Sequence, residues 1–106
     1  MDFTTVLCDQ FHLQPWQVNN VIQLLDEGNT IPFIARYRKE AHGTLDDQVI
    51  RELSERLDYL RNLQKRKEEV GEAIAAQEAM TGELQAALDA AATLAEVEDI
   101  YRPYRP

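Results

Sequence analysis

Residues 46–77 read DDQVIRELSERLDYLRNLQKRKEEVGEAIAAQ, and this stretch decides the fold. Its apolar side chains recur at steps of about three and four residues, close to the seam of a heptad pattern. Because no proline interrupts it, the stretch predicts one long helix over about 46–77, on the order of 48 Å in length at ~1.5 Å per residue. The seam consists of Ile50, Leu53, Leu57, Leu60, Leu63, Val70 and Ile74.

Three positions set our expectations for this helix. Thr44, with the acid Asp47 after it, resembles a capping box and is expected to start the helix. The seam becomes polar at Gln64 and Lys67, so we expect the helix to leave the core there. Gly71 is the expected weak point, since glycine inside a helix costs about 1 kcal/mol relative to alanine.

Two short helices are predicted before the long one. Residues 2–13 carry apolar side chains with the spacing of an amphipathic helix. Pro15 suits the first turn of a second helix, because its missing N–H has no partner there. Gly28 can end that helix in a left-handed conformation. Trp16 is the expected hydrophobic anchor of the pair.

A third helix is predicted from Thr30 to Glu40. Thr30 can cap it, and Pro32 is tolerated in its first turn. Phe33, Ile34 and Tyr37 can share one core face, which places the cations Arg36, Arg38 and Lys39 on the other sides. A cluster of this kind is usually a solvated or ion-paired face. The alternative is a contact with another domain or with nucleic acid.

The remaining residues predict two short helices and a tail. The first follows a break at 80–82, and the second starts at a capping box formed by Thr93 and Glu96. Residues 102–106, RPYRP, favour an extended strap and a linker to downstream domains. The predicted fold is therefore all-α: short N-terminal helices packed on one long helix, two further short helices, and an extended C-terminal strap. We expect a single helical N-terminal domain over 1–106, as a fragment of a longer protein.

The charge is strongly negative, at −8 from 19 acids and 11 bases. Between Glu68 and Asp99 there are nine acids and no lysine or arginine. This half should repel a phosphate backbone. Any polyanion would therefore have to contact the three groups of cations elsewhere, which are Arg36, Arg38 and Lys39, then Arg61, Lys65, Arg66 and Lys67, then Arg102 and Arg105.

Several classes of function are disfavoured. No apolar run approaches the ~20 residues of a membrane span, and no leader precedes the first helix, so we expect a cytoplasmic protein without membrane contact. Cys8 and His12 are two potential ligands where a structural zinc site needs about four. No nucleotide-binding loop or nucleophile–base pair is present. We predict no catalytic residues, no metal, no cofactor and no enzymatic activity.

Three ordered blocks of this chain resemble the N-terminal region of the Tex family of bacterial transcription accessory proteins. They are LLDEGNTIPFIARYRKE at 24–40, ERLDYLRNL at 55–63 and LAEVEDIYRPY at 94–104. The resemblance implies a cytoplasmic, non-enzymatic, nucleic-acid-binding factor with roles in RNA binding and transcription regulation. It also implies that the main nucleic-acid contacts lie in an OB-fold domain outside these residues.

Two functional hypotheses follow from the resemblance. In the first, the region is a scaffold: the long helix props other domains of the parent chain apart, the 30–40 helix docks on one of them, and RNA or DNA is bound through the full-length protein. In the second, the region binds nucleic acid directly. Self-association of the truncated fragment through Leu57, Leu60 and Leu63 is a further alternative. The candidate nucleic-acid or interdomain contacts are Arg36, Tyr37, Arg38, Lys39, Arg61, Lys65 and Arg66.

Overall fold

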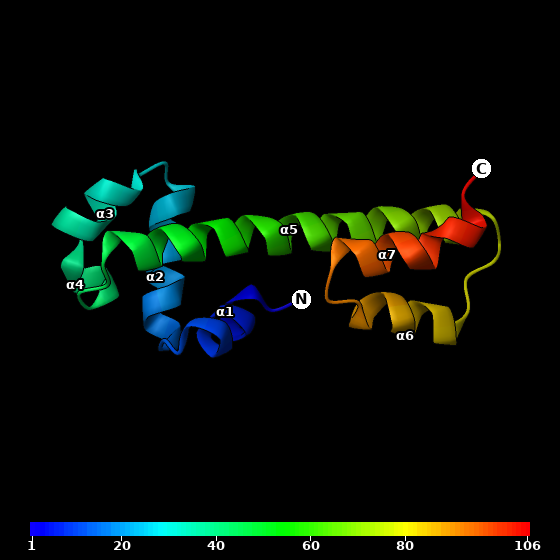
Figure 1. Ribbon diagram of the computed structural model, residues 1–106, viewed down its shortest axis with the longest axis horizontal. Coiled ribbons are helices and arrows are strands. Elements are labelled where there is room, and N and C mark those ends of the chain that lie inside the picture. Colours follow the sequence, from blue (N-terminus) through cyan, green and yellow to red (C-terminus); the bar gives the residue numbers. More distant parts are fainter. The chain divides into compact units, whose positions relative to one another are not determined.

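The computed structural model describes all residues from 1 to 106 and contains helices without any strand, which confirms the all-α prediction. The chain forms two compact units, Met1–Leu60 and Arg61–Pro106. No helix combines the length and the apolar composition needed to cross a membrane. The α-helices, labelled in Figure 1, are α1 (Phe3–Phe11), α2 (Pro15–Asp26), α3 (Ile31–Tyr37), α4 (Lys39–His42), α5 (Asp47–Ala76), α6 (Gly82–Ala90) and α7 (Leu94–Tyr101). The 3₁₀ helix η1 (Arg102–Tyr104) follows α7.

The long helix α5 is uninterrupted over 30 residues, as the heptad pattern predicts. Its first part belongs to the unit Met1–Leu60 and the rest to the unit Arg61–Pro106. All seven seam side chains are at most 3% exposed. Self-association through Leu57, Leu60 and Leu63 is therefore a wrong expectation, because the chain's own helices already cover these leucines.

The start of α5 differs from the predicted capping box. Asp46, rather than Thr44, caps the helix: its Oδ1 accepts a 2.9 Å hydrogen bond from the backbone N–H of Val49. Thr44 has a φ of 73°, a left-handed conformation that places it in the preceding turn.

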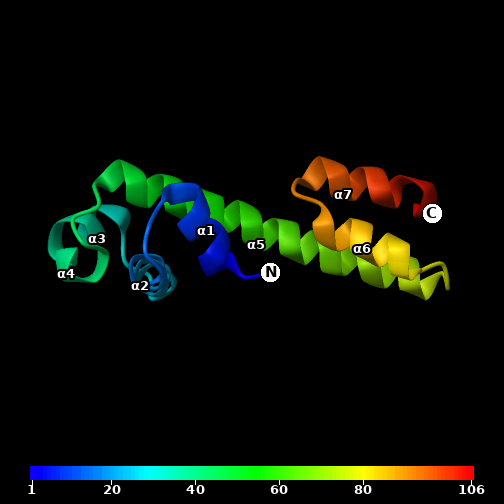
Figure 2. The same cartoon turned by 90° about the horizontal axis from the view of Figure 1, so that it is seen from below.

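In the unit Met1–Leu60, α2 packs against α1, α3 and α4. Figures 1 and 2 together show α2 running across the first part of α5. The predicted anchor Trp16 is 49% exposed, so this expectation is wrong. Its ring lies beside Gly43 instead: a Cβ on that glycine would stand 3.1 Å from Trp16 Cη2. The buried side chains contributed by α1 to α3 are aliphatic, namely Leu7, Val18, Val21, Leu24 and Ile34.

The third predicted helix is divided in two. Thr30 caps α3 as expected, accepting a hydrogen bond from the N–H of Phe33. At Arg38 the backbone leaves the helical region, with φ −123° and ψ 39°, and α4 begins at the next residue. The physical reason lies on α2, whose Gln17 and Asn20 side chains donate hydrogen bonds of 2.8 and 3.0 Å to the carbonyls of His42 and Ala41.

In the unit Arg61–Pro106, α5 does not leave the core at Lys67, contrary to the sequence expectation. Lys67 is 6% exposed, and its Nζ donates a 2.8 Å hydrogen bond to the carbonyl of Asp89 near the end of α6. Next to it, Gly71 faces Leu88 of α6. Thr93 caps α7 by accepting from the N–H of Glu96 at 3.1 Å, so this predicted cap is confirmed.

The C-terminal residues are more compact than the predicted extended strap. Arg102–Tyr104 forms the 3₁₀ helix η1, and the backbone becomes extended at Arg105. Side-chain bonds hold this segment: the Gln77 side chain donates to the carbonyl of Tyr104 at 2.7 Å, Arg105 pairs with Glu98 at 2.6 Å, and Arg102 pairs with Asp99 at 2.9 Å. The predicted extended strap is therefore wrong for residues 102–104, because these bonds stabilise a helical turn there.

Candidate interaction site

The outer side of α3 carries an exposed aromatic pair. Phe33 and Tyr37 are 41% and 63% exposed, and their ring centroids lie 5.4 Å apart at an interplanar angle of 45°. Side chains four residues apart share one side of a helix. Ile34, on the neighbouring side, is completely buried and makes the contact with the core. The predicted core face is therefore confirmed for Ile34 and wrong for the two aromatic residues.

Two cations accompany this aromatic pair. Arg36 is exposed and lies one helical turn from Phe33, and exposed Lys39 lines the same groove as Arg36. Neither makes an ion pair or a side-chain hydrogen bond. We call the four residues Phe33, Arg36, Tyr37 and Lys39 the α3 face. The neighbouring Arg38 is different, since its Nε binds Glu40 Oε1 at 2.6 Å, and this bond lowers the pKa of Glu40.

A groove of ≈ 410 Å³ adjoins the α3 face. Arg36 and Lys39 line it, as do Asp46 and Asp47 at the start of α5. Both carboxylates are already engaged: Asp46 caps α5, and Asp47 pairs with Arg51 at 3.4 Å. Arg36 and Lys39 are therefore the groove's cations without an ion-pair partner, and Asp46, which pairs with no cation, keeps its negative charge in the same groove.

A buried histidine fixes the position of the α3 face. His42 is fully buried; its Nε2 lies 3.0 Å from the carbonyl of Ile34, and its Nδ1 accepts a 2.8 Å hydrogen bond from the N–H of Leu45. The acceptor role of Nδ1 places the ring proton on Nε2, which then donates to Ile34. One neutral side chain thus ties the end of α3 to the turn that leads into α5.

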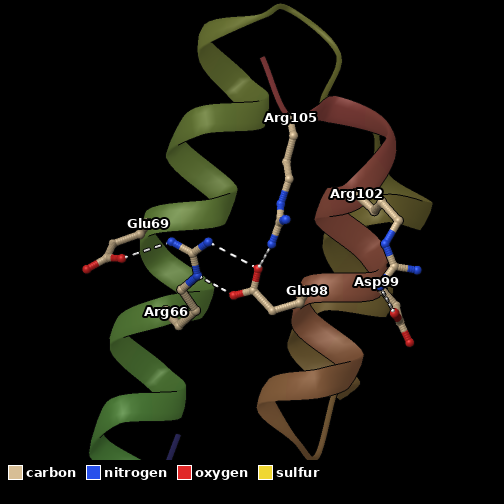
Figure 3. A network of polar contacts seen from close by, with 6 residues as sticks. All are labelled: Arg66, Glu69, Glu98, Asp99, Arg102 and Arg105. Atoms are coloured by element: carbon tan, nitrogen blue, oxygen red, sulfur yellow. Dashed lines mark hydrogen bonds and ion pairs between the residues drawn. The ribbon is translucent and has the colours of Figure 1, made fainter.

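The second group of predicted contact residues lies on α5 in the other unit. Figure 3 shows Arg66 between Glu98 and Glu69. Its Nε and Nη2 bind the two carboxylate oxygens of Glu98 at 2.6 and 3.2 Å, and its Nη1 binds Glu69 at 3.2 Å. The hydrogen bond from Arg66, followed by that from Arg105, lowers the pKa of Glu98 to about 2. The hydrogen bond to Glu98, with the weaker contribution of the bond to Glu69, raises the pKa of Arg66.

Arg66 is therefore occupied by the protein's own carboxylates. It also lies over the ring of Tyr101, with its guanidinium carbon 5.4 Å from the ring centroid. Arg61 is likewise engaged in an interaction, whereas Lys65 is exposed without a partner. Sequence spacing does not reveal this distinction, because Glu98 lies 32 residues from Arg66 along the chain.

Most of the chain's 11 cations are bonded within the protein. Seven of them make a hydrogen bond or an ion pair, namely Arg38, Arg51, Arg56, Arg66, Lys67, Arg102 and Arg105, and Arg61 is engaged in an interaction as well. Arg36, Lys39 and Lys65 are the others, and two of these three belong to the α3 face.

The potential metal ligands singled out from the sequence are not assembled into a cluster. No group of three or more His, Cys, Asp or Glu side chains is placed to hold a metal ion. Burial of Cys8 raises the pKa of its thiol, an effect opposite to that expected of an activated nucleophile.

Comparison with known proteins gives a consistent family. The model of the Tex-like protein N-terminal domain matches residues 1–75. The Transcriptional accessory protein Tex of Neisseria gonorrhoeae is 46% identical over 106 residues, which cover 100% of this chain and 14% of that protein. Protein YhgF of Escherichia coli (strain K12) is 44% identical over 104 residues, 98% of this chain and 14% of that protein.

A human relative extends the comparison. The S1 RNA-binding domain-containing protein 1 of Homo sapiens is 35% identical over 104 residues, which are 98% of this chain and 10% of the human protein. The chain thus spans 10 to 14% of the length of these relatives.

Proposed function

Because the chain belongs to the Tex family, we propose that it is the helical scaffold and interaction region of a nucleic-acid-binding transcription accessory protein. In this role it contacts other domains of the longer protein, and RNA or DNA is bound through those domains. The names of the Neisseria and human relatives, which mention transcription and RNA binding, support this proposal.

One observation carries the scaffold role: the cations are largely used to hold the protein itself together. Eight of the 11 bind carboxylates, carbonyls or other groups of the same chain. Nucleic-acid affinity comes chiefly from cations that neutralise phosphates and release counterions. With a net charge of −8 and three unpaired cations, this region offers few such contacts.

The test is a fluorescence anisotropy titration of labelled single- and double-stranded oligonucleotides with the chain at low salt. We expect no saturable binding. Saturable binding that weakens steeply with added salt would replace the scaffold role with direct nucleic-acid binding.

Direct nucleic-acid binding is the second candidate, favoured by the unpaired Arg36 and Lys39 beside the exposed Tyr37. Under this alternative, Arg36→Glu combined with Arg38→Glu abolishes the binding seen in the titration. Arg102→Glu, which reverses a cation outside the candidate set, serves as the control and leaves that binding in place.

We also propose that the region has no enzymatic activity and works in the cytoplasm. Incubation with a labelled oligonucleotide and magnesium should give no cleavage above the blank. Cleavage that increases with protein concentration and survives further purification would refute the non-enzymatic role.

A further inference from the structure

We propose that the α3 face binds a carboxylate-bearing protein surface on the further domains of the Tex-family protein. The inference rests on the proposed scaffold role and adds to it the residues of the contact and the chemistry of the partner. The juxtaposition of exposed rings with unpaired cations is the observation from which it starts.

The composition of the α3 face is that of a protein-binding hot spot. Aromatic residues and arginine dominate such spots, because they combine a large contact area with directional bonds. Tyr37 is 63% exposed and Phe33 is 41% exposed, so both rings have area left to bury. Scattered single apolar residues need no explanation on a surface, but here two exposed rings are in contact, and Arg36, one helical turn from Phe33, joins them to the groove that it shares with Lys39.

The excess of acidic residues in the unit Met1–Leu60 favours a carboxylate-bearing protein surface over a nucleic acid as the partner. The unit Met1–Leu60 contains ten acids and five bases, and Arg36 and Lys39 are its two unpaired cations. A polynucleotide that extends beyond the α3 face would come within a Debye length, about 10 Å, of these acidic side chains, which would repel its phosphates. One or two carboxylates on a folded domain can reach Arg36 and Lys39 without that repulsion, while apolar groups beside them cover the rings.

The hydrogen bonds of His42 hold α3 in place before any partner binds. His42 binds the carbonyl of Ile34 and the N–H of Leu45, so the end of α3 is already ordered. A face that is rigid before binding loses little conformational entropy on association. The available partner within the same protein is large, because this chain covers 14% of the Neisseria relative and the rest of that protein lies outside the match.

The experiment uses a hybrid in which this chain replaces the matching segment of the full-length Neisseria protein, to which it is 46% identical. Hydroxyl-radical footprinting then measures the oxidation rates of Tyr37 and Phe33 in the hybrid and in the isolated chain. We expect both rates to fall roughly threefold or more in the hybrid, as side chains become covered by an interface core.

Two charge reversals sharpen the test. Arg36→Glu in the hybrid should return the oxidation rate of Tyr37 to that of the isolated chain, since it repels the partner carboxylates. Lys65→Glu makes the same charge change at an unpaired cation outside the α3 face and should leave the protection intact. If the hybrid does not fold, the same footprint is taken with the remainder of the Neisseria protein added in trans to the isolated chain.

Each contrary outcome identifies a different occupant. Unchanged oxidation rates in the hybrid and in trans overturn the inference. Protection that disappears after nuclease treatment assigns the α3 face to nucleic acid, and protection that depends on the concentration of the isolated chain assigns it to a second copy; both also overturn it. Because the scaffold role is tested separately by oligonucleotide titration, a failure of this inference can be distinguished from a failure of the scaffold role.

Discussion

The backbone N–H of Leu45 donates a 2.8 Å hydrogen bond to Nδ1 of the fully buried His42. The other ring nitrogen of His42 meets the carbonyl of Ile34 at 3.0 Å. These two bonds join the last turn of α3 to the entrance of α5, and they position the α3 face.

His42→Leu should destabilise the chain by about 1–3 kcal/mol, because it leaves the buried end of the Leu45 N–H without its acceptor and removes one of the two hydrogen bonds that the Ile34 carbonyl accepts, the other coming from the N–H of Arg38. Urea unfolding followed by circular dichroism measures the change in free energy of unfolding. The matched control is His12→Asn at the exposed second histidine, whose φ of 56° asparagine tolerates. An equal effect of both substitutions would contradict the role assigned to His42.

Two glycines should respond to alanine in opposite directions. Gly71 lies inside α5, and an added Cβ would meet Leu88 Cδ2 at 3.5 Å, an ordinary contact. Gly71→Ala should therefore stabilise the chain by about 0.5–1 kcal/mol through helix propensity. Gly43 has a φ of 70° and has Trp16 Cη2 and Gln17 Nε2 within 3.1 Å of an added Cβ. Gly43→Ala should cost about 1–2 kcal/mol.

Thermal unfolding followed by circular dichroism measures both effects: the melting temperature should rise for Gly71→Ala and fall for Gly43→Ala. A shift of both melting temperatures in the same direction would contradict the environment assigned to one of the glycines.

Glu98 should make the stability of the chain depend on acid pH. Its pKa is lowered from 4.5 to about 2 by Arg66 and Arg105, so the folded state binds a proton less readily than the unfolded state. The stabilisation is complete above pH 4.5 and is lost as the pH falls from 4.5 toward 2. At neutral pH, Glu98→Gln should cost about 1 kcal/mol, allowing for partial solvent screening.

The measurement for Glu98 compares free energies of unfolding at several pH values for the wild type and for Glu98→Gln. The difference between them should shrink toward the acid end of this window. Glu72→Gln removes an exposed carboxylate that binds no cation and should show no such trend. A constant difference for Glu98→Gln would rule out the ion pairs as its cause.

The two compact units should unfold together, as the predicted single domain over 1–106 requires. The helix α5 supplies buried residues to both units, among them Leu60 and Leu63 on either side of their boundary. Loss of one unit would expose part of that helix, so we expect one transition with equal calorimetric and van't Hoff enthalpies. Two resolved transitions would show separate domains.

The long helix and the helix caps could be predicted from the sequence, because they depend on patterns of neighbouring residues. A leucine seam sustained from Ile50 to Ile74 gave α5 to within one residue at each end, and the caps at Thr30 and Thr93 are confirmed. A spacing of three and four residues between apolar side chains, sustained over 30 residues, is typical of one continuous helix.

The candidate site was predicted less well, because it depends on tertiary contacts. A helix of seven residues has too few apolar positions to show which side is buried, so Phe33 and Tyr37 were assigned to the core. Lys67 was expected to mark the end of the covered seam, yet its stem packs inside while Nζ binds a carbonyl of α6. Partners as distant in sequence as Arg66 and Glu98 leave no local pattern.

The central structural claim is that α5 continues as one helix through the boundary between the two units. Amide hydrogen exchange at residues 58–63, resolved by NMR, tests this most directly. The account predicts slow exchange across these amides, with protection factors similar to those of the neighbouring buried turns. Exchange near the unprotected rate at these residues would break α5 into two helices and contradict the scaffold role.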